Sequence, residues 1–184
     1  MRADAQRRRE AILRSARRLF AAQGGGVPLE TIADDAGVGI ATLYRNFESR
    51  DALADAVALA ILDDVTAAAE IARDRMPGGA DAAWRDFVET LVSLDLGALT
   101  DALRTLLPED LPPPMRAAQR EALTDVAEVM AAAREAGVVR AAFEPLELVL
   151  AVGLLTRPPS AAVRAVAPDL VPRLVEVLLS GLRG

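Results

Sequence analysis

Residues 29–50, which read LETIADDAGVGIATLYRNFESR, decide the fold of this chain. Their apolar spacing predicts two short helices, 29–36 and 40–47, joined by a tight turn. Gly37 falls in that turn, where glycine adopts a positive φ at little cost. Leu43 and Phe47 lie four residues apart and form one inward face of the second helix. We therefore predict a helix-turn-helix, whose second helix is free to enter a major groove of DNA.

The other face of the second helix carries the residues that we expect to meet DNA. Small residues at its N-terminal end allow a close approach to base edges. Thr42, Tyr44 and Asn46 can donate to phosphates, and Arg45 is the best candidate for a bidentate contact with guanine. The next helix begins near Arg50, and its N-terminus favours an anion. Two other interpretations stay open at this point: Tyr44 as a core residue and Arg45 as an ordinary solvated charge.

Glycines and prolines divide the rest of the chain into further helices. A first helix is expected over residues 5–23, and a long fourth one, capped by Ser49, is expected through about residue 75. Later helices are expected at 80–95, 97–107, 113–136, 145–156 and 168–182, with a short one capped by Ser160 before Pro168. The predicted fold is all-α. It has an N-terminal three-helix helix-turn-helix domain, residues 1–50, and a larger C-terminal helical bundle, residues 51–184.

Composition narrows the classes of function that the chain can have. Of its 184 residues 52% are hydrophobic, and it contains neither cysteine nor histidine. That composition excludes disulfides, cysteine nucleophiles and the usual zinc sites, so we expect no metal, no cofactor and no enzyme. An enzyme that uses the acidic pairs Asp34–Asp35 or Asp63–Asp64 is disfavoured, because neighbouring side chains on a helix point about 100° apart. No long apolar run or secretory signal is present, so we expect a soluble cytoplasmic protein without membrane contact.

Charge is unevenly distributed along the sequence. The whole chain carries a net charge of -6. Residues 1–50 nevertheless hold nine arginines against six acidic residues, a balance of +3, and the remainder holds twelve against twenty-one, a balance of -9. A basic end on an acidic body orients a protein toward a polyanion such as DNA.

Several segments of residues 8–60 resemble the tetracycline-repressor (TetR) family of bacterial regulators. The likeness lies in Ala11-Ile-Leu to Leu19-Phe20, Glu30-Thr-Ile-Ala, Ala36-Gly-Val-Gly, Thr42-Leu-Tyr-Arg-Asn-Phe and Ser49-Arg-Asp-Ala-Leu53. The resemblance implies an all-helical homodimer with an N-terminal DNA-binding domain. It also implies a C-terminal domain that binds a small-molecule inducer.

The family's usual base- and phosphate-contacting positions can be transferred residue by residue. They fall on Gly39, Ile40, Ala41, Thr42, Tyr44, Arg45, Asn46 and Arg50. The chain departs from the family pattern at four of them, because Ser, a polar residue, Gly and His are more usual at positions 39, 40, 41 and 46. These departures bear on the operator sequence that is read, and less on the act of binding DNA.

The last two long helices are apolar on nearly every side. Such a helix has to be buried on more than one side, so one side is expected to pack in the subunit and the other against a second copy. The residues assigned to that interface are Leu148, Val152, Leu155, Val171, Val175, Leu179 and Leu182. A two-fold dimer would present two recognition helices to a near-palindromic double-stranded operator.

The resemblance also implies an effector pocket, which would lie among the bulky residues of the middle helices. They are Trp84, Phe87, Leu91, Met115, Met130 and Phe143. Core packing is the alternative role for each of them, and an apolar lining would suit a hydrophobic effector. The sequence therefore predicts a dimeric, ligand-responsive repressor that a small apolar molecule releases from its operator. The alternative is a helical interaction or carrier protein that has lost DNA binding.

Overall fold

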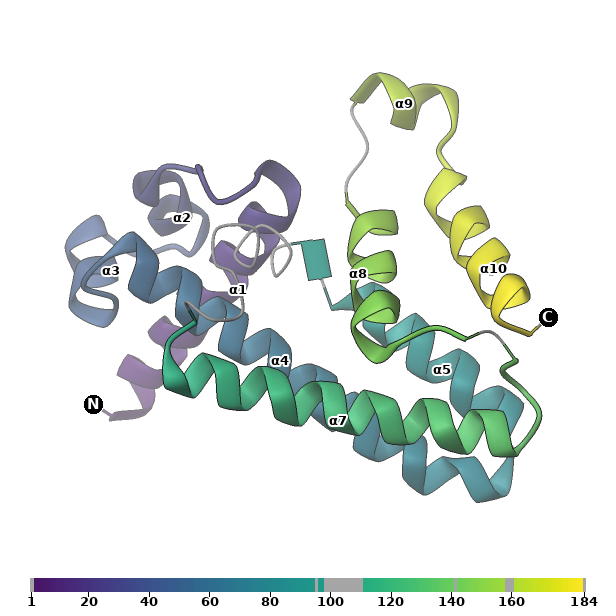
Figure 1. The fold of residues 1–184 in the computed structure, drawn as a ribbon. Coiled ribbons are helices and arrows are strands. Elements are labelled where there is room, and N and C mark those ends of the chain that lie inside the picture. The colour runs from purple at the N-terminus through teal and green to yellow at the C-terminus, as the bar shows by residue number, and fades with distance from the viewer. Residues whose placement is uncertain (1, 95, 98–110, 141, 158–160, 184) are drawn as a thin grey trace.

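The computed structural model of the chain describes residues 2–94, 96–97, 111–140, 142–157 and 161–183, and these residues form helices without a strand (Figure 1). The N-terminal helices are α1 (Arg2–Gln23), α2 (Leu29–Asp35) and α3 (Ile40–Asn46). The helices that follow are α4 (Arg50–Arg75), the 3-10 turn η1 (Met76–Gly78), α5 (Ala80–Ser93), α7 (Pro113–Glu135), α8 (Pro145–Leu155), α9 (Ala161–Val166) and α10 (Leu170–Arg183). The predicted all-α class is confirmed.

The predicted helix bounds agree with the observed ones to within three residues. Most of the helix predicted over 97–107 lies outside the described residues, as does Ser160, the expected cap of the short helix now seen as α9. Among the helices that the structure describes, none is long and apolar enough to cross a membrane.

The long helix α4 connects the N-terminal helices to the C-terminal bundle. It packs against α1 on one side and against α5 and α7 on the other (Figure 1). Leu53, Val57, Ile61 and Val65 recur at steps of four and are all buried, which is the inward stripe of an amphipathic helix. Burying one such side chain contributes about 1.5–3 kcal/mol. This stripe makes α4 a shared wall of the N-terminal helices and of the bundle.

A capping box that we did not predict begins α8. The Glu144 side chain accepts from the backbone at Glu147, and the Glu147 carboxylate accepts in return from the Glu144 backbone N–H at 2.8 Å. Pro145 fills the first helical position, where its missing N–H costs nothing. The two glutamates therefore satisfy donors that the helix itself leaves unpaired.

The faces of α8 and α10 differ from those assigned to the dimer interface. Helix α8 packs against α5, α7 and α10 within one subunit, which uses the sides on which most of the assigned residues lie. Five of the seven are buried in the subunit's own core, namely Leu148, Val152, Val175, Leu179 and Leu182, whereas Leu155 and Val171 are half-buried. That face assignment has to be corrected, because side chains buried within one subunit are not free to contact a second.

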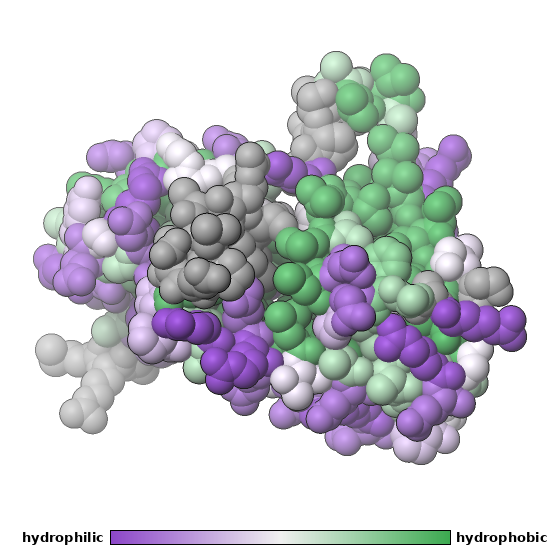
Figure 2. Space-filling model, in the orientation of Figure 1, coloured by the Kyte–Doolittle hydropathy of each residue, from purple (hydrophilic) through white to green (hydrophobic). Residues whose placement is uncertain are grey.

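Other apolar residues face outward on the same helices. Leu146, Leu154, Val163, Val166, Leu170 and Val177 are all exposed. Figure 2 shows the hydrophobic surface that runs over α8, α9 and α10. We call this set of six residues the apolar face. Exposed apolar residues that gather on one side of a protein mark a surface for association.

Candidate DNA-binding site

The turn between α2 and α3 is built by backbone hydrogen bonds and one glycine. Gly37 has a φ of 67°, in the left-handed region where a Cβ is strained. The Val38 N–H donates to the Ala33 carbonyl at 2.9 Å and the Gly37 N–H to the Asp34 carbonyl at 3.1 Å. Gly39 then takes an extended conformation and caps α3 without a side chain. The predicted tight turn is confirmed, and it fixes the direction in which α3 leaves α2.

The inner face of α3 anchors it on the other N-terminal helices. Leu43 and Phe47 are buried, as predicted from their spacing. The guanidinium of Arg9 on α1 lies over the Phe47 ring, 4.9 Å from its centroid, which is a cation–π contact. Ile12 and Ile32 belong to the same core. Because these residues face inward, the opposite side of α3 is left uncovered.

The outer face of α3 presents the residues that the sequence assigned to DNA. Tyr44 has 49% of its surface exposed, so its alternative role as a core residue is wrong. Arg45, Gly39 and Ala41 are exposed as well. The remaining assigned residues are half-buried, namely Ile40, Thr42, Asn46 and Arg50. Seven of the eight assigned residues therefore lie on α3 or at its N-cap, and the eighth, Arg50, begins α4.

Local hydrogen bonds orient the polar side chains of this face. Arg45 Nη2 donates to Thr42 Oγ1, and Asn46 Nδ2 donates to the Thr42 carbonyl, both at 2.8 Å. Arg50 Nη1 donates to the Gly25 carbonyl at 2.8 Å, a contact that braces the loop before α2. This loop contact was not foreseen, because nothing in the sequence pairs two residues that lie 25 positions apart.

The N-terminus of α4 adjoins this face. Ser49 caps it, as predicted, and its hydroxyl accepts from the Ala52 N–H at 3.0 Å. A capped helix start still carries free N–H groups and the positive end of the helix dipole. Arg50 is the first residue of that helix. The same element thus supplies both a partial positive charge and a guanidinium beside α3.

A polar contact between α1 and α2 fixes the first helix of the helix-turn-helix against α1. Ser15 on α1 is the buried polar residue of the described chain. Its side chain and the Arg18 guanidinium both interact with the Asp35 carboxylate at the end of α2. The hydrogen bond from Ser15, and then that from Arg18, lowers the pKa of Asp35 below 3.8. Asp35 therefore has a structural role that the sequence did not reveal.

The members of the two acidic pairs, Asp34–Asp35 and Asp63–Asp64, differ in their contacts. Asp35 pairs with Arg18 and Asp64 with Arg17, whereas their neighbours Asp34 and Asp63 are exposed. In the part of the chain that the structure describes, no three carboxylates are placed to hold a metal ion.

The bulky residues assigned to the effector pocket lie together in the core of the bundle. Trp84, Phe87, Leu91, Met115 and Met130 are buried, and Phe143 packs against them half-buried. The rings of Trp84 and Phe87 are 6.0 Å apart and tilted by 45°, within the range of favourable aromatic pairs. The indole Nε1 of Trp84 is buried and has no hydrogen-bond partner among the residues that the structure describes.

A glycine-turned pair of helices with an exposed second helix, set in a basic N-terminal region, defines the chain as a helix-turn-helix protein of the DNA-binding class. A sequence profile of the bacterial regulatory proteins of the tetR family matches residues 12–57. A TetR transcription regulatory protein from Mycobacterium vanbaalenii is 34% identical, with a TM-score of 0.59, over 100% of this chain and 99% of its own. The chain therefore belongs to the TetR family of DNA-binding transcriptional regulators.

Two further crystal structures resemble the whole chain. The TetR-like regulator LfrR from Mycobacterium smegmatis, solved in complex with proflavine, is 28% identical with a TM-score of 0.69 and covers 96% of this chain and 94% of its own. A TetR regulator from Streptomyces coelicolor is 28% identical with a TM-score of 0.61, over 95% and 98% of the two chains. A comparison with curated proteins finds no match.

Proposed function

We propose that the protein is a dimeric repressor that binds a near-palindromic operator through α3 and is released by a small apolar molecule. The exposed outer face of α3 carries this proposal. Tyr44 and Arg45 project from it, while Leu43 and Phe47 hold the helix down. The residues proposed to contact DNA are those predicted from the sequence: Gly39, Ile40, Ala41, Thr42, Tyr44, Arg45, Asn46 and Arg50.

Dimerisation is proposed to use the apolar face of α8, α9 and α10. Leu154 and Val177 are 65% and 66% exposed, and burying such side chains between two copies is favourable at about 25 cal/mol per Å². A two-fold axis would place two α3 helices on half-sites about 10 base pairs apart, or a multiple of that spacing. A single α3 would bind weakly and mostly through phosphates.

The domain division near residue 50 is also a proposal. It is supported by α1, which contacts α2, α3 and α4, and by the contacts of α4 with α5 and α7. Residues 51–184 would form the effector-binding and dimerisation part. Because α4 belongs to both parts, we expect a movement of α4 to carry a change in the bundle to the N-terminal helices.

The effector is proposed to bind in the core around Trp84, Phe87 and Leu91. The proflavine complex of LfrR supports an aromatic effector, because that relative covers nearly the whole chain. Within the described ranges, the Trp84 Nε1–H is a buried donor without a partner, and such a group is costly until it finds an acceptor. We therefore propose an apolar molecule that presents an acceptor atom to Trp84. It would release DNA by binding the DNA-free conformation more tightly.

Selection of genomic DNA fragments by the purified protein tests this function. We expect recovery of fragments that share an inverted repeat, bound in a gel-retardation assay at physiological salt. Fragments without a shared sequence, or no fragments at all, would favour the alternative of a helical carrier that has lost DNA binding.

A further inference from the structure

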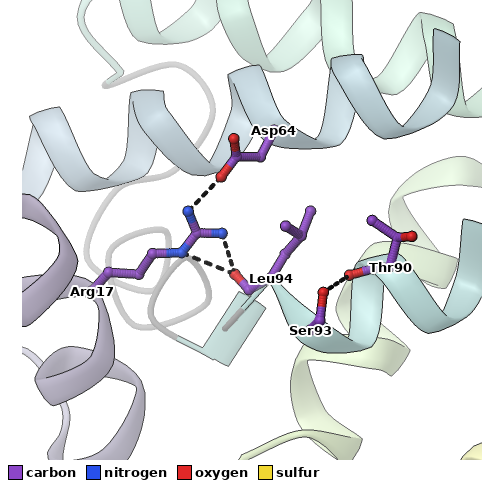
Figure 3. Close-up of polar contacts among 5 residues, drawn as sticks. All are labelled: Arg17, Asp64, Thr90, Ser93 and Leu94. Carbon is purple, nitrogen blue, oxygen red and sulfur yellow. Dashed lines mark hydrogen bonds and ion pairs between the residues drawn. The ribbon is translucent and has the colours of Figure 1, made fainter. Parts of the chain in front are cut away.

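The guanidinium of Arg17 joins three helices at the boundary between the N-terminal helices and the bundle. Arg17 lies on α1, and its side chain is only 18% exposed. Its Nη1 donates to Asp64 Oδ2 on α4 at 2.5 Å. Its Nε and Nη2 both donate to the carbonyl of Leu94, at 3.3 and 2.7 Å (Figure 3). Leu94 is the residue that caps the C-terminus of α5.

This arrangement satisfies a group that α5 cannot satisfy itself. The last carbonyls of a helix have no intrahelical donor and carry the negative end of its dipole. A guanidinium is suited to the contact, because its donors form a fixed planar fork that reaches several acceptors together. An ammonium group lacks that fork. The charge of Arg17 is meanwhile balanced by Asp64, so that the end of α5 is tied to both α1 and α4.

The chain directly after α5 makes a second close approach to α1. Gly97 is buried, and a Cβ built on it would lie 3.9 Å from the Ala21 carbonyl on α1. The same Cβ would lie 3.7 Å from the Gly153 carbonyl on α8. Leu94 and Gly97 thus lie against two successive turns of α1, and Gly97 also lies against α8. A movement of the end of α5 is therefore transmitted to α1 by direct contact.

The seam between α1 and α4 is partly open near Arg17. A hollow of about 180 Å³ lies along this seam. Its lining residues are Glu10, Leu13, Arg14, Arg17, Val57 and Ala60. Because this part of the seam is open, the hydrogen bonds of Arg17 determine how α1 lies against α4 and α5 more than they would in a filled interface.

We propose that Arg17 is a clamp that couples the effector core to the position of the helix-turn-helix. The inference rests on the proposed function, and it adds a second path of coupling to the one proposed through α4. Trp84, Phe87 and Leu91 lie on α5, the helix whose end Arg17 holds. On the other side, α1 carries α2 through the Ser15, Arg18 and Asp35 contact. An effector that shifts the end of α5 would move α1, and α2 and α3 with it.

Thermodynamic reciprocity allows a test that needs no effector. If the end of α5 controls DNA binding, DNA binding must in turn change the end of α5. Hydrogen exchange of residues 88–97 is measured in the full-length protein, with and without a saturating duplex recovered by genomic selection. We expect the duplex to change their exchange about fivefold or more, the lower end of allosteric couplings. In Arg17→Gln we expect this response to fall below about twofold while the duplex still binds.

Two more variants make the outcome specific. Arg17→Lys keeps the charge without the fork and is expected to respond like Arg17→Gln. Arg7→Gln removes an exposed ion pair with Asp4 within α1 itself, outside the route from α5 to α2, and is expected to respond like the wild type. A full response in Arg17→Gln or Arg17→Lys, or none in the wild type, would overturn the clamp. A wild type that binds no selected duplex would instead refute the proposed function.

Discussion

At the scale of single residues, arginine makes most of the long-range polar contacts of this protein. The printed sequence contains no lysine, so that all 21 cationic side chains are arginines. Arg17 and Arg18 leave α1 on different sides, one toward Asp64 and the bundle and the other toward Asp35 and α2. The planar guanidinium suits such multiple contacts. Sequence composition alone did not distinguish these arginines from solvated ones.

The variant Arg45→Ala tests the DNA-facing side of α3. It removes an exposed guanidinium, and we expect about 5- to 150-fold weaker binding of the selected duplex, the range of one lost base contact. Tyr44→Phe should weaken binding about fivefold by removing one hydrogen bond. Fluorescence anisotropy at fixed salt measures both. The control Arg75→Ala lies at the far end of α4 beside Asp86 and should bind normally; equal affinity in all four proteins would contradict the assigned face.

Asp35 predicts a dependence of stability on pH. Ser15 and Arg18 lower its pKa below 3.8 in the folded protein. Its ionised form therefore stabilises the fold above that pH, and this contribution is lost as the pH falls through the lowered pKa. We expect Asp35→Asn to unfold at lower urea than the wild type at pH 7, with a smaller difference near pH 3. The matched variant Asp34→Asn, at an exposed neighbour, should unfold as the wild type does at both pH values. A difference for Asp35→Asn that persists unchanged at low pH would contradict the contact.

At the scale of elements, the helix-turn-helix could be predicted because its information is local. Gly37, Leu43 and Phe47 lie within eleven positions, and each is required by its own backbone conformation or helical face. The stripe of α4 was predictable for the same reason, since apolar residues recur at steps of four. The helices after α4 were placed by their glycine and proline breaks.

The glycine turn itself gives a prediction about stability. Gly37 has a positive φ, and a Cβ added there would meet none of the described atoms within 4 Å. Gly37→Ala is therefore expected to destabilise the fold through backbone strain alone, by about 1 kcal/mol. Gly39→Ser is the contrasting variant, because Gly39 has a negative φ and serine is a better helix cap. In urea unfolding, Gly37→Ala should lower the free energy of unfolding, whereas Gly39→Ser should not. Equal stability of Gly37→Ala and the wild type would mean that the turn is not held as described.

What could not be predicted depends on contacts between distant segments. Arg17 and Leu94 are 77 positions apart, and no periodicity pairs a side chain with a carbonyl at that separation. The faces of α8 and α10 were misassigned because both helices are apolar on several sides. Hydrophobicity shows that such a helix is buried, whereas only the neighbouring helices decide which side the subunit covers.

At the scale of the whole molecule, the outer face of α3 and the apolar face lie on different sides. The outer face of α3 lies at one end, and the apolar face of α8, α9 and α10 lies at the other side of the molecule (Figures 1 and 2). Pairing through the apolar face leaves α3 uncovered in both copies. Trp84 lies on α5, which contacts both α4 and α8, so a change there can reach either surface.

One variant of the apolar face separates dimerisation from folding. Leu154→Glu places a charge on a residue that is 65% exposed in the subunit, so the subunit itself should fold normally. A charge buried between two copies is costly unless it is paired, so we expect a monomer. Ile71→Glu changes a comparably exposed apolar residue, 59% exposed on α4, and should remain a dimer.

Sedimentation of the purified protein with a duplex recovered by genomic selection tests the central claim most directly. We expect the wild type and Ile71→Glu to sediment with the duplex as a complex that contains paired chains. Leu154→Glu should lose most of that complex at the same protein concentration, because a single α3 binds weakly. A wild-type complex of one chain per duplex, formed equally well by Leu154→Glu, would contradict the account.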